Sequence, residues 1–303
     1  MRIGVVIGRP GGYGDTLAQL VAEYEQARAA DVSSVWMTQH LGFDALTLIS
    51  SWGVDSDVEV GTAVIPVQTR HPVVLAEQAL TAQALCGGRL ALGLGLAHAD
   101  TLEGVYGLPR RRSVSYLSDY LSTLDALMAG KRATPNESFA LSTRIGAAEL
   151  PTPPQVLIAA LGPRMLQLAG ERTAGTITWM TGTATIESYV SPTIRAAAEA
   201  AGRPDPRVVV CLPVCVTDDA ASARERLGAA IDVYSGIPSY RAMLDREGVD
   251  DAVDVAIIGN ADEVGAALTG LSSRGATDVV AIPAGDPDEV GATWDLISDI
   301  AKA

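Results

Sequence analysis

The stretch 57–98 constrains the fold of this chain most, because it reads as a strand, a helix and a second strand. A run rich in β-branched residues opens it, and Pro72 suits the first turn of the helix, where its missing N–H breaks no hydrogen bond. Gly87 and Gly88 end that helix, and residues 90–96 form a near-continuous apolar strand. A strand of this kind needs cover on both faces, so the stretch predicts one β–α–β unit of a parallel sheet.

The same alternation of short apolar strands and amphipathic helices continues along all 303 residues, which is typical of an α/β protein with a parallel sheet. Strands are expected at residues 3–7, 33–38, 57–65, 90–98, 156–160, 175–180, 207–217 and 277–282. Eight strands in a chain of this length fit a (β/α)₈ barrel better than an open sheet, with extra segments near 99–112, 131–154 and 236–260. No linker divides the chain, so residues 1–303 are expected to form a single domain.

The composition argues against several classes of partner. With 22 Lys and Arg against 36 Asp and Glu, the net charge of −14 disfavours a nucleic acid or an anionic membrane surface. No segment reaches the roughly 18 apolar residues of a membrane span, and the N-terminal sequence does not resemble a signal peptide, so a cytoplasmic protein is expected. The three cysteines lie in apolar surroundings without a CxxC pair and are expected to be buried.

Residues 93–98, with the sequence GLGLAH, begin like a dinucleotide-binding fingerprint, but His98 stands where the third glycine would be. In a barrel these residues lie at the carboxyl end of a strand, where active sites form. Gly95, Ala97 and His98 are therefore candidate ligand contacts, although tight packing explains the glycines equally well.

A second candidate is the turn formed by Ala159, Ala160, Leu161, Gly162, Pro163 and Arg164. A strand leads into this turn, and a helix begins at Pro163, so the free N–H groups of its first turn and the helix dipole favour an anion. Arg164 adds a positive charge. An ordinary connection between a strand and a helix is the alternative interpretation.

Gln39 and His40 follow the second expected strand and lie on the same rim. The ordinary pKa of histidine suits acid–base chemistry near neutral pH, although a lone histidine is more often structural. The histidines at 40, 71 and 98 show no metal-ligand spacing with acidic residues, so no metal is expected. Trp179 ends another strand and either lines the pocket or packs in the barrel wall.

These motifs together give the chain a family resemblance, carried by GTAVIPVQTRHPVVLAEQALTAQALCGGRLALGLGLAH, SSVWMTQH, IAALGPRMLQLAG and TITWMTG. In their order and spacing they resemble the bacterial luciferase-like monooxygenase superfamily, and most closely its branch that uses the deazaflavin coenzyme F420. The resemblance implies a (β/α)₈ barrel that forms a homodimer, and an oxidoreductase that transfers a hydride between the deazaflavin and a small organic substrate.

The resemblance also implies roles for individual residues. The turn 160–164 would hold the cofactor phosphate, and the ring would stack on Ala63 and Val64, where relatives have a strand bulge, often with a non-proline cis peptide. His40 would donate or accept the proton, and Gln39 would orient the ring. Two departures stand out: Gln39 replaces an acidic residue found in many relatives, and Ala63 replaces a common glycine.

Several alternatives stay open on sequence alone. An FMN-dependent monooxygenase of the same superfamily, using reduced flavin and O₂, would share the fold, and a barrel that has lost its cofactor would serve as a non-redox ligand-binding protein. Glu103, Tyr106 and Arg110–Arg112 form either a solvated patch or contacts to a cofactor tail, and residues 239–248 form a lid or a dimer contact. The substrate and the direction of hydride transfer are not specified.

Overall fold

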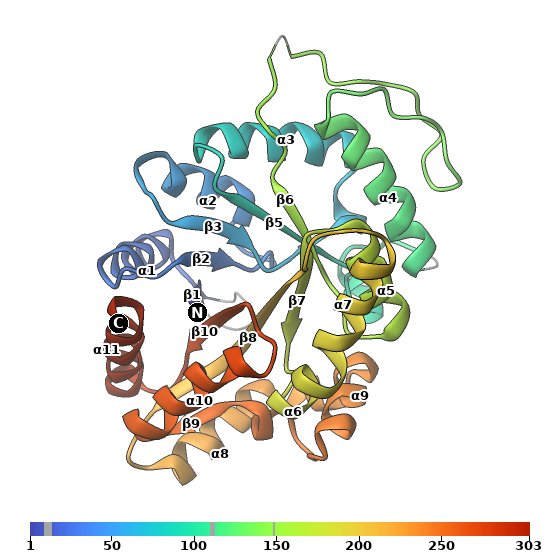
Figure 1. Cartoon of the computed structure of the whole chain (residues 1–303). Coiled ribbons are helices and arrows are strands. Elements are labelled where there is room, and N and C mark those ends of the chain that lie inside the picture. The colour runs from blue at the N-terminus through green and yellow to red at the C-terminus, as the bar shows by residue number, and fades with distance from the viewer. Residues whose placement is uncertain (9–13, 110–112, 148) are drawn as a thin grey trace.

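The protein is a closed barrel of eight parallel strands, as the computed structural model shows for residues 1–8, 14–109, 113–147 and 149–303 (Figure 1). The strand order β10-β1-β2-β3-β5-β6-β7-β8 closes because β8 also pairs with β10. The barrel strands are β1 (Arg2–Ile7), β2 (Ser34–Met37), β3 (Glu59–Thr62), β5 (Leu90–Gly95), β6 (Gln155–Ala159), β7 (Gly175–Trp179), β8 (Arg207–Val216) and β10 (Asp278–Pro283). The predicted (β/α)₈ fold is confirmed.

Helices surround the barrel and alternate with its strands (Figure 1). The outer helices are α1 (Leu17–Ala29), α2 (Ala45–Trp52), α3 (Pro72–Leu85), α4 (Ser113–Met128), α5 (Pro163–Arg172), α7 (Ser191–Ala200), α8 (Ala220–Ile231), α10 (Ala261–Ser273) and α11 (Pro287–Lys302). Local sequence determines where several helices begin: Asn260 and Asp286 open capping boxes for α10 and α11, and the Asp44 side chain caps α2 by accepting from the N–H of Thr47. His71 caps α3, its side chain accepting from the N–H of Val73.

The barrel interior is filled by side chains rather than open. Trp36 is fully buried there and packs with an apolar cluster that includes Ile177, Val209 and Val280. A Cβ on Gly61 would lie 2.4 Å from the Trp36 ring, so the glycine makes room for the indole. A larger cluster joins the outer faces of the strands to the helices, and Cys86, Cys211 and Cys215 are buried and free, as expected.

The third strand differs from the single strand predicted over 57–65. It ends at Thr62, the Ala63–Val64 peptide bond is cis, and β4 (Ile65–Pro66) then pairs with β5. Thr62 Oγ1 donates to the carbonyl of Gly93 (2.8 Å) and accepts from its N–H (2.9 Å), so a side chain replaces part of the ladder. The cis peptide that the resemblance implied is present with Ala63.

The chain between α8 and α10 also differs from expectation. Residues 236–260 were predicted only as an extra segment, but they contain α9 (Pro238–Glu247) and β9 (Ile257–Gly259). β9 pairs with residues 214–216 of β8, beyond the stretch 207–211 that pairs with β7. The helical stretch after β7 is divided into α6 (Thr183–Thr185), a π-helical turn (Ile186–Val190) and α7. The fourth barrel strand ends at Gly95 rather than at His98.

Charged residues at the amino ends of four strands form an ion network at the base of the barrel. Arg207 Nη2 lies 2.6 Å from Asp278 Oδ1 and 2.8 Å from Glu59 Oε1. Arg2 contacts the same carboxylates at 3.0 and 2.9 Å. The Asp278 side chain is only 1% exposed and that of Arg207 15%, whereas that of Arg2 is 45% exposed. Arg207 is therefore the main counter-charge of a buried carboxylate.

Removing Arg207 is expected to destabilise the fold far more than removing Arg2. Arg207→Ala should lower the free energy of unfolding by about 3 kcal/mol, because the only cation that Asp278 then keeps is the solvent-exposed Arg2, beside a neutral hydroxyl donor, Thr277. The matched control Arg2→Ala should cost about 1 kcal/mol or less. Urea denaturation followed by circular dichroism measures both, and an equal effect of the two substitutions would contradict this view of the base.

Candidate functional site

The carboxyl ends of the parallel strands meet at one rim, and several predicted site residues lie there. Ala63, Val64 and Trp179 are partly buried and pack on top of the apolar cluster inside the barrel. Ala63 and Val64 follow β3, and Trp179 ends β7, so residues far apart in sequence form a common apolar floor. Such a floor suits one face of a flat ring.

Gly95, Ala97 and His98, at and after the carboxyl end of β5, differ in their contacts at the rim. A Cβ on Gly95 would lie 2.5 Å from Val64 Cγ2 and 3.4 Å from Ala159 Cβ, so tight packing accounts for this glycine. The N–H of Ala97 donates to Gln68 Oε1 at 3.0 Å. His98 is exposed, and its ring lies 5.5 Å from the Tyr240 ring between centroids.

The turn 159–164 joins β6 to α5 and presents an open helix terminus. The N-cap residue Gly162 provides no side-chain cap, and a Cβ placed on it would meet nothing within 4 Å. Pro163 is the first helical residue, and the side chains of Pro163 and Arg164 are exposed. Pro163 has no N–H, and the N–H of Met165 donates to the Gly162 carbonyl at 3.0 Å. The N–H groups of Gly162 and Arg164 have no partner among the described residues, so with the helix dipole this terminus can bind an anionic group such as a phosphate.

His40 lies half-buried just after β2. Burial lowers the pKa of its imidazole, and the nearby charge of Asp15 partly opposes this shift. Within the described part of the chain the ring makes no hydrogen bond. A neutral imidazole with both nitrogens available can donate or accept a proton at the mouth of the barrel.

Gln39 is fixed by hydrogen bonds behind His40. Its Oε1 accepts from Arg70 Nη2 (2.9 Å) and from the N–H of Ala45 (3.0 Å), and its Nε2 donates to the carbonyl of His40 (3.0 Å). Arg70 also pairs with Asp44, the N-cap of α2, and its side chain is only 12% exposed. Gln39 thus positions the chain around His40, and only one amide hydrogen is left for the predicted contact with a ring.

Sequence reasoning missed Arg70 and two tyrosines, Tyr234 and Tyr240, near the rim. Tyr234 lies 5.7 Å from Trp179 and 5.3 Å from Tyr240 between ring centroids. Both tyrosines come from the segment after α8, and no local pattern specifies where such an insertion folds back. The basic run Arg110–Arg112 lies outside the described residues.

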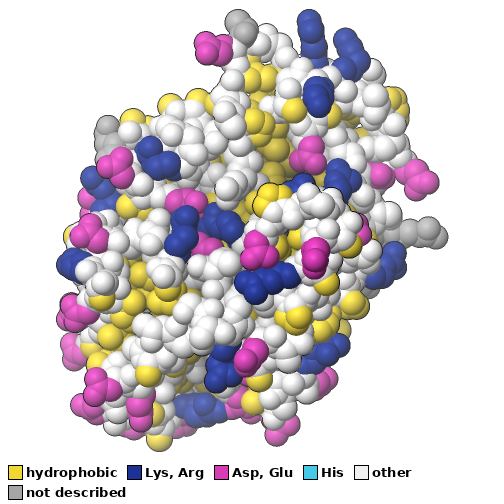
Figure 2. Space-filling view, in the orientation of Figure 1, with side chains coloured by type: hydrophobic (Ala, Val, Ile, Leu, Met, Phe, Trp, Pro, Cys, Tyr) yellow, Lys and Arg dark blue, Asp and Glu magenta, His cyan; other side chains and the backbone are white. Residues whose placement is uncertain are grey.

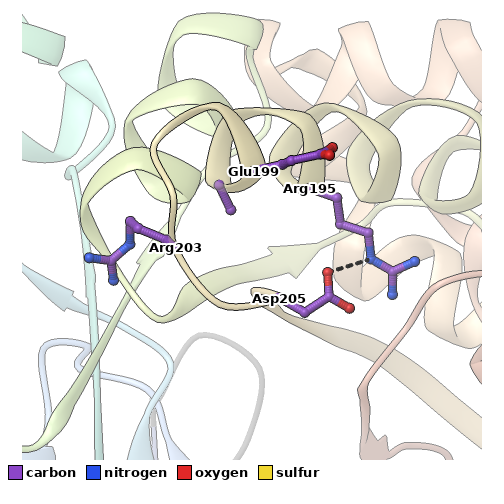
Figure 3. A pocket seen from close by; sticks show the side chains of 5 residues that line it. Arg195, Glu199, Arg203 and Asp205 are labelled. Carbon is purple, nitrogen blue, oxygen red and sulfur yellow. Dashed lines mark ion pairs between the residues drawn. The ribbon is translucent and has the colours of Figure 1, made fainter.

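Other surfaces offer weaker candidates. A hollow of about 440 Å³ is lined by Arg195, Ala198, Glu199, Arg203 and Asp205, between α7 and the amino end of β8 and so away from the carboxyl ends of the strands (Figure 3). Arg195 Nε lies 3.8 Å from Asp205 Oδ1, and Arg203 donates to the carbonyl of Thr173 at 2.9 Å, so its cations already have partners. On the face in Figure 2, acidic and basic side chains are interspersed rather than gathered into one basic patch.

The described residues contain neither a metal-binding cluster nor a membrane-spanning helix. No group of three or more His, Cys, Asp or Glu side chains in the described ranges could hold a metal ion. None of the helices in the described part of the chain is both long and apolar enough to cross a membrane.

The fold and the rim together define a (β/α)₈ barrel with an apolar floor, an open helix terminus and a histidine at the carboxyl ends of its strands. The family follows from comparison with known proteins. The model of the luciferase-like monooxygenases matches residues 1–294, and the chain belongs to that family. This membership supports an oxidoreductase.

Individual relatives cover nearly the whole chain. It is 26% identical over 295 residues to a 5,10-methylenetetrahydromethanopterin reductase of Methanolobus tindarius, covering 92% of this chain and 87% of that protein. The structure of the coenzyme F420 dependent tetrahydromethanopterin reductase from Methanopyrus kandleri superposes with a TM-score of 0.79, 19% identity and 98% coverage of each chain. The oxygenating constituent of the 3,6-diketocamphane monooxygenase from Pseudomonas putida, in complex with FMN, gives 0.77 and 15%, covering 100% of this chain and 97% of that one. These two structures show the fold alone.

The pKa of His40 tests the described arrangement of charges around this histidine. Asp15→Asn should lower the pKa of His40 further, because it removes the negative charge that partly offsets burial. An NMR titration of the histidine Cε1–H signals measures the shift, with His40→Asn to assign the resonance.

His98 provides the internal control for this titration. Burial lowers its pKa too, but its opposing charge is Asp100, so it should respond to Asp100→Asn and not to Asp15→Asn. A His40 pKa that stays constant or rises in Asp15→Asn would contradict the described arrangement.

Proposed function

We propose that this chain is a deazaflavin (coenzyme F420)-dependent oxidoreductase that transfers a hydride between the cofactor and a small organic substrate. The observation that carries the proposal is the pairing of an uncapped, open α5 terminus with the apolar floor formed by Ala63 and Val64. A cofactor with a flat ring and a phosphate matches these two features. The reductases among the relatives support the same activity.

The rim residues fit such a cofactor in their chemistry. Residues 160–164 would hold the phosphate through main-chain N–H groups, the helix dipole and the Arg164 guanidinium. The ring would lie against Ala63 and Val64, flanked by residues that end the neighbouring strands. These flanking residues are Gly95, Ala97, His98, Ala159 and Trp179.

The bound deazaflavin would supply or accept the hydride. His40 would hold the proton that moves with it, since burial keeps the imidazole neutral near pH 7 and thus able to donate or accept. Gln39 and Arg70 would keep His40 in place, because their hydrogen bonds fix its carbonyl and the start of α2. The apolar floor would exclude water from the reacting face.

The second candidate is a luciferase-like monooxygenase that uses reduced FMN and O₂. The observation that favours it is the open α5 terminus, which would bind the phosphate of FMN equally well, together with the FMN complex among the structural neighbours. A non-redox barrel without a cofactor is the third candidate, and the intact terminus at Gly162 counts against it. We also propose a single domain over residues 1–303, a homodimer and a cytoplasmic location, all on the basis of the family resemblance and the sequence.

A titration of apo-protein with oxidised and reduced coenzyme F420, and separately with FMN, tests the proposal. Coenzyme F420 should bind, and Arg164→Ala should weaken binding about three- to tenfold by removing a charge beside the phosphate. Arg172→Ala, at the other end of α5, is the matched control and should have no effect. Tight binding of FMN alone would favour the monooxygenase, and binding of neither cofactor would contradict a redox function.

Gly162 allows a sharper test of the phosphate position. Its φ of −75° and ψ of 157° suit any residue, and the space around it is open, so Gly162→Ala should fold and bind normally. Gly162→Glu places a carboxylate at the anion site and should weaken binding of coenzyme F420 at least tenfold. The phosphate-free deazariboflavin should bind both variants equally, and an equal loss for this probe would contradict the assignment.

A further inference from the structure

Four side chains form a continuous aromatic row beside the candidate site: Trp179, Tyr234, Tyr240 and His98. Their ring centroids are separated in turn by 5.7, 5.3 and 5.5 Å. Neighbouring rings are steeply inclined, with interplanar angles of 82°, 87° and 61°. This edge-to-face arrangement is the favoured packing of aromatic rings.

The aromatic row crosses the mouth next to the proposed phosphate site. His98 follows β5 and Trp179 ends β7, and β6, which carries the turn into α5, lies between these two strands. The two tyrosines bridge this gap from the segment after α8, Tyr234 from a 3₁₀ turn (Asp232–Gly236) and Tyr240 from α9. The barrel closes without this segment, because β8 pairs directly with β10.

The aromatic row is accessible and uncharged. Trp179, Tyr234 and Tyr240 are half-buried, and His98 is exposed. Burial raises the pKa of both tyrosines, and partial desolvation by neighbouring groups lowers the pKa of His98, so all three side chains are neutral near pH 7. The hydroxyl of Tyr240 has no hydrogen-bond partner among the residues that the structure describes.

The charged side chains of α9 make contacts outside the aromatic row. Arg241 pairs with Asp245 at 2.7 Å, and the Arg246 guanidinium lies 3.9 Å from the centre of the Tyr189 ring. Glu247 accepts from the N–H groups at the start of α6, at 3.0 Å from Ala184 and 2.7 Å from Thr185. The helix therefore contributes an aromatic ring to the mouth, and its one cation without a carboxylate contact among the described residues, Arg246, lies over Tyr189, outside the aromatic row.

We propose that the aromatic row is the substrate-binding wall of this site and selects an uncharged, flat aromatic compound. This inference rests on the proposed function for the identity of the reaction, but not for the binding itself. A planar ring extends the edge-to-face series of the row, whereas a saturated ring of similar shape lacks the quadrupole that favours these contacts. An anionic substrate would lose hydration without gaining a partner from α9.

Isothermal titration calorimetry with matched ketones tests the inference on the full chain, both with and without coenzyme F420. The probes are 2-acetylnaphthalene, its fully saturated analogue 2-acetyldecalin and the anionic 6-acetyl-2-naphthoate. The wild type should bind 2-acetylnaphthalene about three- to tenfold more tightly than the saturated ketone, and more tightly than the naphthoate. Tyr240→Leu should abolish the preference for the aromatic ketone, and Tyr240→Phe should retain it.

Tyr189→Leu is the matched control, because it removes a tyrosine that contacts α9 outside the aromatic row. It should leave the preference unchanged. The inference is overturned if the saturated ketone binds as tightly as the aromatic one, if neither binds, or if Tyr240→Leu keeps the preference. Failure of coenzyme F420 to bind while the aromatic preference persists would instead overturn the proposed function alone.

Discussion

Pairing between β8 and β10 is the constraint on which the rest of the structure depends, because it closes a sheet whose strands all run in the same direction. Closure brings the carboxyl ends of all strands to one rim and their amino ends to the other. At the base, Arg207 pairs with the buried carboxylate of Asp278, so the charges there stabilise the contact between β8 and β10. At the mouth, an apolar floor and a free helix terminus are left available for a ligand.

The candidate site combines residues that packing and hydrogen bonds hold in place with side chains from the segment after α8. Packing and hydrogen bonds fix the floor, since Gly95 makes room for Val64 and Thr62 bonds across to Gly93. Gln39 donates to the main-chain carbonyl of His40, so this glutamine helps to position the histidine. The segment after α8 adds aromatic side chains to this frame. It is therefore where we place the choice of substrate, while the proposed cofactor site lies on the barrel itself.

The regular part of the fold could be predicted from sequence, because period and composition are local signals. The turn at Gly162 was recognisable for the same reason, since proline and glycine at a strand–helix junction have a defined geometry. Contacts between distant segments could not be predicted in this way. The bond between Gln39 and Arg70 joins residues 31 positions apart, and β9 is a three-residue strand within an acidic region whose pairing with β8 depends on the finished barrel. The approach of Tyr240 to His98 likewise depends on tertiary structure.

The central claim is that this rim binds a deazaflavin, with the ring on the floor and the phosphate at α5. A crystal structure of the protein with oxidised coenzyme F420 tests it most directly. The account predicts the ring against Ala63 and Val64 and the phosphate within hydrogen-bond distance of the main chain at residues 162–164. A cofactor bound elsewhere, or with its phosphate remote from α5, would contradict it.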